Sequence, residues 1–265
     1  EKPYYNDRPF YQLKMDKEFL LEEFNEAINS IQYPLHFIDF ETCTMAVPFH
    51  KGMKPFQNVI FQWSCHTLHE DGSIEHSEWL NVSDYYPNFE FAKSLKAQIG
   101  TKGTVLTWSS YENSQLRAIK NTLEEAEDFD AELFHWLESI IVVDKKDDSN
   151  RILDMHDLAK LYYFHPLMGG RTSIKVVLPA VLQETKNDRS KVLLQQENLY
   201  QSKEDGKLID PYKLLEERIV EDTKSLTIKV RNGGDAMVAY REMLYGLSRN
   251  NSEAKTAYAD ALKKY

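Results

Sequence analysis

The sequence has few cysteines, no long apolar run and no excess of positive charge. Its 265 residues include two cysteines, Cys43 and Cys65, which are too few for a disulfide framework and predict a protein of the reducing cytoplasm. No apolar stretch approaches the ~20 residues of a membrane span, so no membrane association is expected. The net charge of −10 argues against a general electrostatic coat for nucleic acid. It still permits a nuclease, since metal sites gather carboxylates.

Several common functional motifs are also missing. The chain contains no Walker loop, no Gly-x-Gly-x-x-Gly, no nucleophile elbow and no cysteine or histidine spacing typical of zinc sites. Hydrophobic residues make up 42% and aromatic residues 12% of the chain, which is enough to build a core and speaks against global disorder.

The apolar patterns predict a mixed α/β fold. Strands are expected at residues 35–42, 59–69 and 74–80, and Asp71-Gly72 is typical of a hairpin turn. These strands form an antiparallel meander. A fourth strand at 104–108 then alternates with helices at 89–99, 112–123 and 131–140, so the class is α/β with a mixed central sheet flanked by helices.

Helical spacing recurs at both ends of the chain. It predicts a lead-in helix at residues 15–31 and later helices at 154–163, 173–182 (broken by Pro179), 212–220, 235–247 and 253–265. The expected organisation is a helical lead-in at residues 1–32 and one domain at 33–265. Residues 184–232 are polar and irregular and are interpreted as an insertion or mobile arm.

Asp39 and Glu41 are the most informative residues of the chain. They lie two apart on the first predicted strand, so their side chains share one face, while Ile38 and Phe40 take the other. Neighbouring carboxylates repel, and burial increases that cost. A hard cation such as Mg²⁺ offsets it, because it takes oxygen ligands from one or two carboxylates. The alternative is a strand end with two solvated acids.

Glu112 is a third candidate ligand. It follows the fourth strand at the start of a helix, where it would point toward the same cation as Asp39. A carboxylate in the first turn is also favoured by the helix dipole and needs no function there.

These acids resemble the motifs of the DEDD group of 3′–5′ exonucleases, whose fold is ribonuclease H-like. Asp39-Phe40-Glu41 matches the first motif, and Ser109-Ser110-Tyr111-Glu112 matches the second with Glu in place of Asp. The resemblance is closer to a bacterial domain family of unknown function with a ribonuclease H-like fold, often appended to RecB-like predicted nucleases. It rests on segments such as Phe61-Gln62-Trp63-Ser64-Cys65-His66 and Gly233-Gly234-Asp235-Ala236, and covers residues 30–265.

The resemblance implies a nuclease that uses two Mg²⁺ or Mn²⁺ ions held by Asp39, Glu41, Glu112 and a fourth acid. That acid is expected just beyond Tyr265; Asp235 and Asp260 are possible substitutes, although Asp235 fits a helix N-cap better. The expected partners are DNA or RNA and another nuclease domain of the same polypeptide.

Four further residues are candidates for substrate binding: Lys175, Gln62, His66 and Tyr111. Each has a structural alternative, either core packing or a solvated surface position. The rival function is an inactive ribonuclease H-like module that binds nucleic acid or a partner domain. The longer Glu112 side chain and the absent fourth acid favour this rival, whereas the intact Asp39-x-Glu41 pair favours the enzyme.

Overall fold

The computed structural model describes residues 17–145, 147, 149–184, 188–196, 198–214 and 228–265. The chain divides into two compact units. Ile31–Leu153 and Asp222–Tyr265 form one, which we call the sheet unit, and Glu1–Ser30 and Asp154–Glu221 form the other, which we call the smaller unit. This grouping follows compactness and does not test the predicted boundary at residue 33, which stays a prediction.

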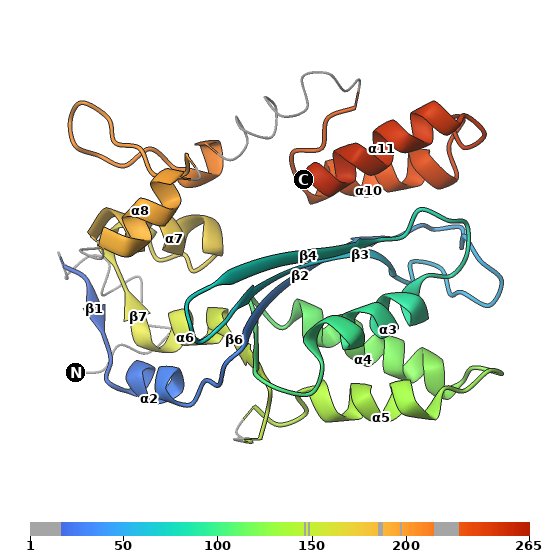
Figure 1. Ribbon diagram of the computed structural model, residues 1–265, viewed down its shortest axis with the longest axis horizontal. Helices are drawn as coiled ribbons and strands as arrows, with labels where there is room; N and C mark the ends of the chain where they lie inside the picture. The colour runs from blue at the N-terminus through green and yellow to red at the C-terminus, as the bar shows by residue number, and fades with distance from the viewer. Residues whose placement is uncertain (1–16, 146, 148, 185–187, 197, 215–227) are drawn as a thin grey trace. The chain divides into compact units, whose positions relative to one another are not determined.

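The sheet unit is built on a five-stranded mixed sheet in the order β4-β3-β2-β5-β6 (Figure 1). Its strands are β2 (Leu35–Cys43), β3 (Val59–Leu68), β4 (Ile74–Leu80), β5 (Thr104–Thr107) and β6 (Ile152–Asp154). β3 is antiparallel to both β2 and β4, which confirms the predicted meander, and β5 is parallel to β2. β6 adds to the expected strands; with three residues it is too short to leave a sequence pattern.

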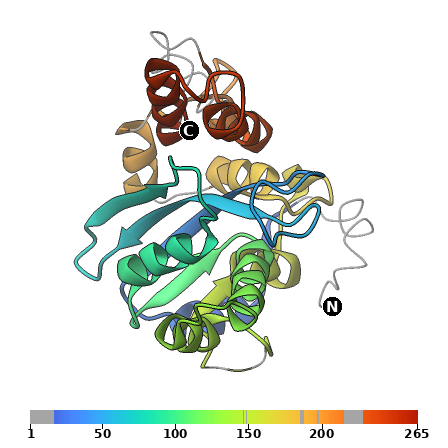
Figure 2. The ribbon, with the colours of Figure 1, turned by 90° about the vertical axis from the view of Figure 1, so that its right-hand side faces the viewer.

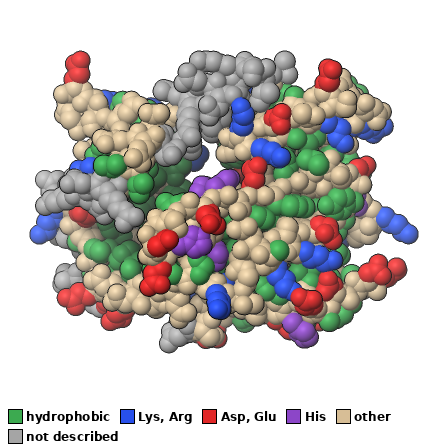
Figure 3. Space-filling model, in the orientation of Figure 1, with side chains coloured by type: hydrophobic (Ala, Val, Ile, Leu, Met, Phe, Trp, Pro, Cys, Tyr) green, Lys and Arg blue, Asp and Glu red, His purple; other side chains and the backbone are tan. Residues whose placement is uncertain are grey.

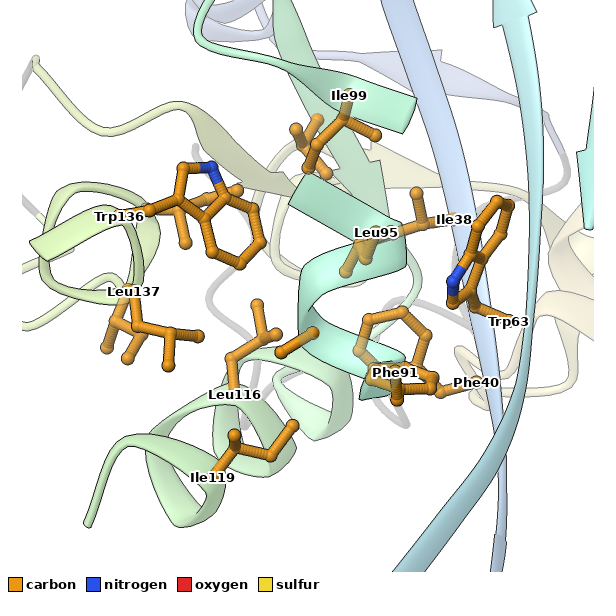
Figure 4. Close-up of a cluster of buried hydrophobic side chains, with 14 of the residues drawn as sticks. Ile38, Phe40, Trp63, Phe91, Leu95, Ile99, Leu116, Ile119, Trp136 and Leu137 are labelled. Atoms are coloured by element: carbon orange, nitrogen blue, oxygen red, sulfur yellow. The ribbon is translucent and has the colours of Figure 1, made fainter. Parts of the chain in front are cut away.

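One face of the sheet is covered by α3 (Asn88–Ile99), α4 (Tyr111–Glu124) and α5 (Ala131–Ile140), close to the predicted helices. Their apolar sides meet the sheet in a core that Figure 4 shows in close-up; it includes Ile38, Phe40, Trp63, Phe91, Leu95, Leu116, Ile119, Trp136 and Leu137. The ring of Phe40 lies edge-on to that of Phe91, with 4.8 Å between their centroids. Burial of such side chains contributes about 1.5–3 kcal/mol each.

The opposite face carries α10 (Gly233–Leu244) and α11 (Ser252–Lys264), as Figure 2 shows. They enclose a second core with β2 and β3, made of Cys43, Val59, Phe61, Val230, Ala236, Ala239, Tyr240, Met243, Leu244, Ala261 and Leu262. The ring of Tyr240 stacks on that of Phe61 at 4.1 Å, and its hydroxyl accepts a hydrogen bond from Asn81 Nδ2 at 2.8 Å. The sheet is therefore covered by helices on both faces.

A β-bulge interrupts the pairing of β2 with β3. Glu41 pairs with Gln62 and Thr42 with Ile60, so Phe61 is the extra residue. Phe61 belongs to the second core, and Gln62 reaches the same side. Phe61 and Gln62 therefore point to the same face, because the extra residue of a bulge breaks the regular alternation of side chains along a strand.

The smaller unit combines a two-stranded sheet with short helices. β1 (Phe19–Leu20) pairs antiparallel with β7 (Tyr163–Phe164), and the rings of Phe19 and Phe164 stack at 5.2 Å. Its helices are α2 (Glu23–Asn29), α6 (Met155–Tyr162), the 3-10 helix η2 (Pro166–Met168), α7 (Ile174–Glu184) and α8 (Asp188–Gln196).

Three predictions about helices need correction. The lead-in helix covers only Glu23–Asn29, because Phe19–Leu20 gains a strand partner. α7 continues through Pro179; proline removes one hydrogen bond, and buried Val177 and Ala180 on either side hold the helix in place. The cap of α10 is Asn232, not Asp235, which is the third helical residue.

The predicted helix at residues 212–220 lies mostly outside the described residues. Residues 211–214 are helical, and the predicted arm at 184–232 also contains α8. Among the described residues, no helix is both long and apolar enough to cross a membrane.

Candidate active site

Strand β2 carries its two acids on the side away from the larger core. Ile38 and Phe40 are 5% and 4% exposed and pack under α3. Asp39 between them is exposed, and Glu41 is partly buried. The prediction that the two carboxylates share one face of a central strand is therefore confirmed, since alternate side chains point to opposite sides.

The two carboxylates raise the cost of each other's charge. Burial, followed by the negative charge of Asp39, raises the pKa of Glu41 to about 7, while a hydrogen bond from the Tyr265 hydroxyl opposes the shift. Asp39 is open to solvent, yet the surrounding protein desolvates it enough to raise the pKa of its carboxyl as well. A nearby cation would relieve both penalties.

Glu112 lies at the start of α4, the helix that follows β5. β2 and β5 are parallel, so their carboxyl ends share one edge of the sheet. Between strand and helix, Ser109 has a φ of 104°, a strained value for a residue with a side chain. Thr107 Oγ1 supports this turn by donating to Ser109 O at 3.0 Å. Glu112 itself is buried, with 4% of its surface exposed.

Tyr111 links the three acids. Its hydroxyl lies 2.6 Å from Thr42 Oγ1, next to Glu41 on the same strand. Burial raises the pKa of Tyr111, the bond to Thr42 lowers it, and negative charge on Glu41, Glu112 and Asp39 raises it further. All three predicted carboxylates thus lie near enough to this phenol to act on it.

The first turn of α10 covers Glu41 from above the sheet. A Cβ atom placed on Gly233 would lie 3.3 Å from Glu41 Oε2, so the helix backbone approaches the carboxylate closely. Asn232 caps this helix by accepting from Asp235 N, and the positive end of the helix dipole therefore faces Glu41. Tyr265 has its pKa raised by burial first and then by the charges of Glu41 and Asp39.

The acids fit one cation better than two. Asp39 and Glu41 supply the one or two carboxylates that Mg²⁺ takes when substrate and water complete its coordination. Across the described part of the chain, however, no group of three or more His, Cys, Asp or Glu side chains is gathered closely enough to hold a metal ion. Glu112 is near the pair without joining it as a ready third ligand.

A family model described as "Domain of unknown function (DUF2779)" matches residues 36–173. The chain belongs to this family. The match includes Asp39, Glu41, Tyr111 and Glu112 and ends before α10 begins at Gly233. No curated protein and no solved structure matches the chain.

The substrate-binding candidates of this family member have different surroundings. Gln62 is 5% exposed, and its Nε2 donates to the carbonyl oxygen of Leu262 at 3.0 Å. Its side-chain amide is therefore engaged by α11. His66 is exposed on β3, and its ring centroid lies 4.5 Å from that of His76. Burial, followed by the charge of His76, lowers the pKa of His66.

Lys175 belongs to the smaller unit. It lies in the first turn of α7, and its Nζ is 5.7 Å from the ring centroid of Tyr212. Sequence reasoning missed the residues that surround Glu41, because Gly233 and Tyr265 are about 190 and 220 positions away from it. The local signal that could have indicated the contact is Gly233-Gly234, since glycine permits a close approach of the backbone.

Proposed function

We propose that the sheet unit is a metal-dependent phosphodiester hydrolase that acts on DNA or RNA, with Asp39 and Glu41 as its cation ligands. The observation that supports this most directly is the placement of Asp39 and Glu41 on one side of β2, where burial and Asp39 raise the pKa of Glu41 to about 7. Two carboxylates held side by side at such a cost, on the side of β2 away from the larger core, match the donor set that hard cations use with phosphate.

Each residue of the site would have a separate role in hydrolysis. A cation bound by Asp39 and Glu41 would lower the pKa of a water molecule and neutralise charge on the phosphate. Asp39, which is exposed, gives access to solvent and substrate. Tyr111, 40% exposed and hydrogen-bonded to Thr42, would offer its ring for stacking on a base and its hydroxyl for contact with the substrate.

The finer expectations come from the resemblance. They are a ribonuclease H-like fold, a 3′–5′ exonuclease activity, and a second Mg²⁺ or Mn²⁺ ion that would use Glu112. The mixed sheet with helices on both faces and the position of Glu112 at the carboxyl edge support them. A second ion would need oxygen ligands from the substrate, since the described residues provide no third gathered side chain.

Binding to nucleic acid would depend on local features, because the chain as a whole is negative. On the face shown in Figure 3, acidic and basic side chains are interspersed, and histidine side chains gather near its centre. That face offers little long-range attraction for phosphate, and a cation at Asp39 and Glu41 would supply positive charge.

One observation favours the second candidate, a module that binds nucleic acid or a partner domain without hydrolysis. Glu41 is already covered by the start of α10, and the Tyr265 hydroxyl donates to it. These contacts stabilise the carboxylate in part as a cation would, and they compete with one.

The test measures Mn²⁺ binding by calorimetry and Mn²⁺-dependent digestion of end-labelled single strands. Asp39→Asn and Glu41→Gln should abolish both, whereas the matched controls Asp128→Asn and Glu127→Gln change exposed acids and should alter neither. If the strands bind without being cut, the second candidate replaces the first.

Under that second candidate, Tyr265→Phe should not produce digestion. A gain of Mn²⁺ affinity in Tyr265→Phe would show that the Tyr265 hydroxyl competes with the ion for Glu41.

A further inference from the structure

The smaller unit contains a cavity of about 710 Å³ that the proposed hydrolysis does not use. It is lined by residues 17–18, which directly precede β1, by the η2 turn, by α7 and by the segment around Lys207. Pockets for small molecules occupy about 300–1,000 Å³, so the space suits a compact organic ligand.

The lining is basic in a chain that is acidic overall. Four cationic side chains face two carboxylates: Lys17, Arg171, Lys175 and Lys207 against Glu18 and Asp210. This gives a charge of 4 − 2 = +2, in contrast to −10 for the whole chain. The cavity therefore favours an anion.

Both carboxylates are engaged by protein donors. Glu18 accepts from the Tyr163 hydroxyl at 2.8 Å, and Asp210 Oδ1 accepts from the backbone N–H of Tyr212 at 3.0 Å. Of the four cations, Lys207 has an ion pair with Asp205 at 3.5 Å, in which both side chains are exposed. Such a pair contributes little and is easily exchanged for another anion.

The local backbone fixes the position of Arg171. Gly169 and Gly170 have φ values of 56° and 74°, which glycine adopts without strain. They turn the chain so that Arg171 N donates to the carbonyl oxygen of Met168, which is buried. Thr172 Oγ1 is hydrogen-bonded to His156 Nε2 at 2.8 Å. Arg171 is thus held between two anchored neighbours.

Lys175 follows in the first turn of α7, whose dipole adds positive potential at the same end of the cavity. A guanidinium supplies paired donors that match the oxygens of a phosphate, and a lysine adds a point charge. The remaining lining includes the apolar side chains of Pro166, Leu167, Val176, Pro179 and Leu208, which would favour an apolar or aromatic portion of the ligand.

We propose that this cavity binds a nucleoside phosphate, with its phosphate at Arg171 and Lys175 and its base against the apolar lining. A free mononucleotide and the phosphorylated end of a strand carry the same chemistry, so either is a possible source. The proposal does not depend on cation binding at Asp39.

Calorimetry in EDTA with adenosine 5′-monophosphate, adenosine and inorganic phosphate tests the proposal on the full chain. The monophosphate should bind saturably, and the other two probes more weakly, because each lacks half of the recognised chemistry. Arg171→Gln and Lys175→Gln should each weaken binding roughly tenfold or more, the loss expected for a hydrogen bond to a charged group. Lys203→Gln, which changes an exposed lysine outside the cavity, should have no effect.

A second arm separates the two sources. A short oligonucleotide with a terminal phosphate should bind more tightly than its dephosphorylated form if the ligand is a strand end, and this advantage should disappear in Arg171→Gln. The proposal is overturned if neither adenosine 5′-monophosphate nor the phosphorylated oligonucleotide binds. It is also overturned if both bind wild type and the Arg171→Gln/Lys175→Gln double variant equally well while the unfolding temperature of the variant is unchanged.

The two proposals fail separately. Asp39→Asn should leave binding of the monophosphate in EDTA unchanged, and Arg171→Gln should leave Mn²⁺ affinity unchanged. Loss of nucleotide binding in Asp39→Asn would assign it to the sheet unit and overturn the cavity as the site.

Discussion

The two sides of strand β2 have opposite roles in the same nine residues. On one side Ile38 and Phe40 are buried in the larger core beneath α3, α4 and α5. On the other side Asp39 is exposed, and Glu41 is partly buried at the first turn of α10. On the first side, burial of apolar side chains stabilises the fold. On the second side, burial disfavours the ionised form of the carboxyl groups. Residues that stabilise the core and residues of the candidate site therefore alternate along the same strand.

The second side is itself divided along the strand. Cys43 belongs to an apolar core with Phe61 and Tyr240, whereas Glu41, two residues earlier, carries a carboxyl group near Tyr265. The change from polar to apolar coincides with the bulge at Glu41 and Thr42. Bulges reorient side chains and are common beside active sites, so the bulge marks the boundary between the candidate site and the second core.

The largest effect should come from the apolar side. Phe40→Ala removes a ring that is 4% exposed and contacts Phe91, and the cavity should lower the free energy of unfolding by about 3–5 kcal/mol. Urea titration measures this. Val47→Ala, at a position that is 73% exposed, is the control and should change it by less than about 0.5 kcal/mol. A loss below that value for Phe40→Ala would mean that α3 does not depend on this contact.

The next effect concerns the charge of Glu41. Its pKa is raised from 4.5 to about 7 in the folded protein, so the folded state holds the proton more tightly than the unfolded state. The associated stability is complete below about pH 4.5 and is lost as the pH rises through about 7, with a total of up to about 3 kcal/mol.

Urea titrations in EDTA between about pH 5 and about pH 8 test this sign. The free energy of unfolding of wild type should fall with pH relative to that of Glu41→Gln, which cannot ionise. Parallel curves for the two proteins would show that Glu41 is not desolvated by α10 and would remove the main support for the cation site.

Much of the sheet unit follows from sequence pattern, because its strands and helices are long enough to repeat their period. The meander, the Asp71-Gly72 turn and helices α3 to α5 are predicted to within a few residues. The two- and three-residue strands β1, β6 and β7 are not, since tertiary partners create them. Apolar residues at helical spacing thus misplace Phe19–Leu20 in a helix.

The candidate site is predictable only in its local part. The two-residue spacing of Asp39 and Glu41 places them on one face, and the strand-to-helix junction places Glu112 at the edge of the sheet. The approach of Gly233 and Tyr265 to Glu41 joins segments that no periodicity connects. Similarly, Gln62 is a candidate for substrate binding by sequence, but its side chain is hydrogen-bonded to α11.

A smaller effect should come from the cap of α10. Asn232 Oδ1 accepts from Asp235 N at 3.0 Å, and Asn232→Ala should lower the free energy of unfolding by about 1 kcal/mol. Asn121→Ala, an exposed position within α4, serves as the matched control and should be neutral or slightly stabilising. If Asn232→Ala also lowers the pKa of Glu41, α10 desolvates that carboxylate; if it raises the pKa, the dipole of α10 is the stronger influence.

The smallest change in stability is expected at Asp39, where the two sides of β2 differ most. At about pH 5, where Glu41 holds its proton and does not repel Asp39, Asp39→Asn should shift the free energy of unfolding in EDTA by less than about 0.5 kcal/mol. Its effect should appear only when a cation is present. A ligand that binds the folded state alone raises the unfolding temperature with its concentration, so Mn²⁺ should stabilise wild type and not Asp39→Asn. If Mn²⁺ raises the unfolding temperature of both proteins equally, the ion binds elsewhere, and the exposed side of β2 is a surface without the proposed chemistry.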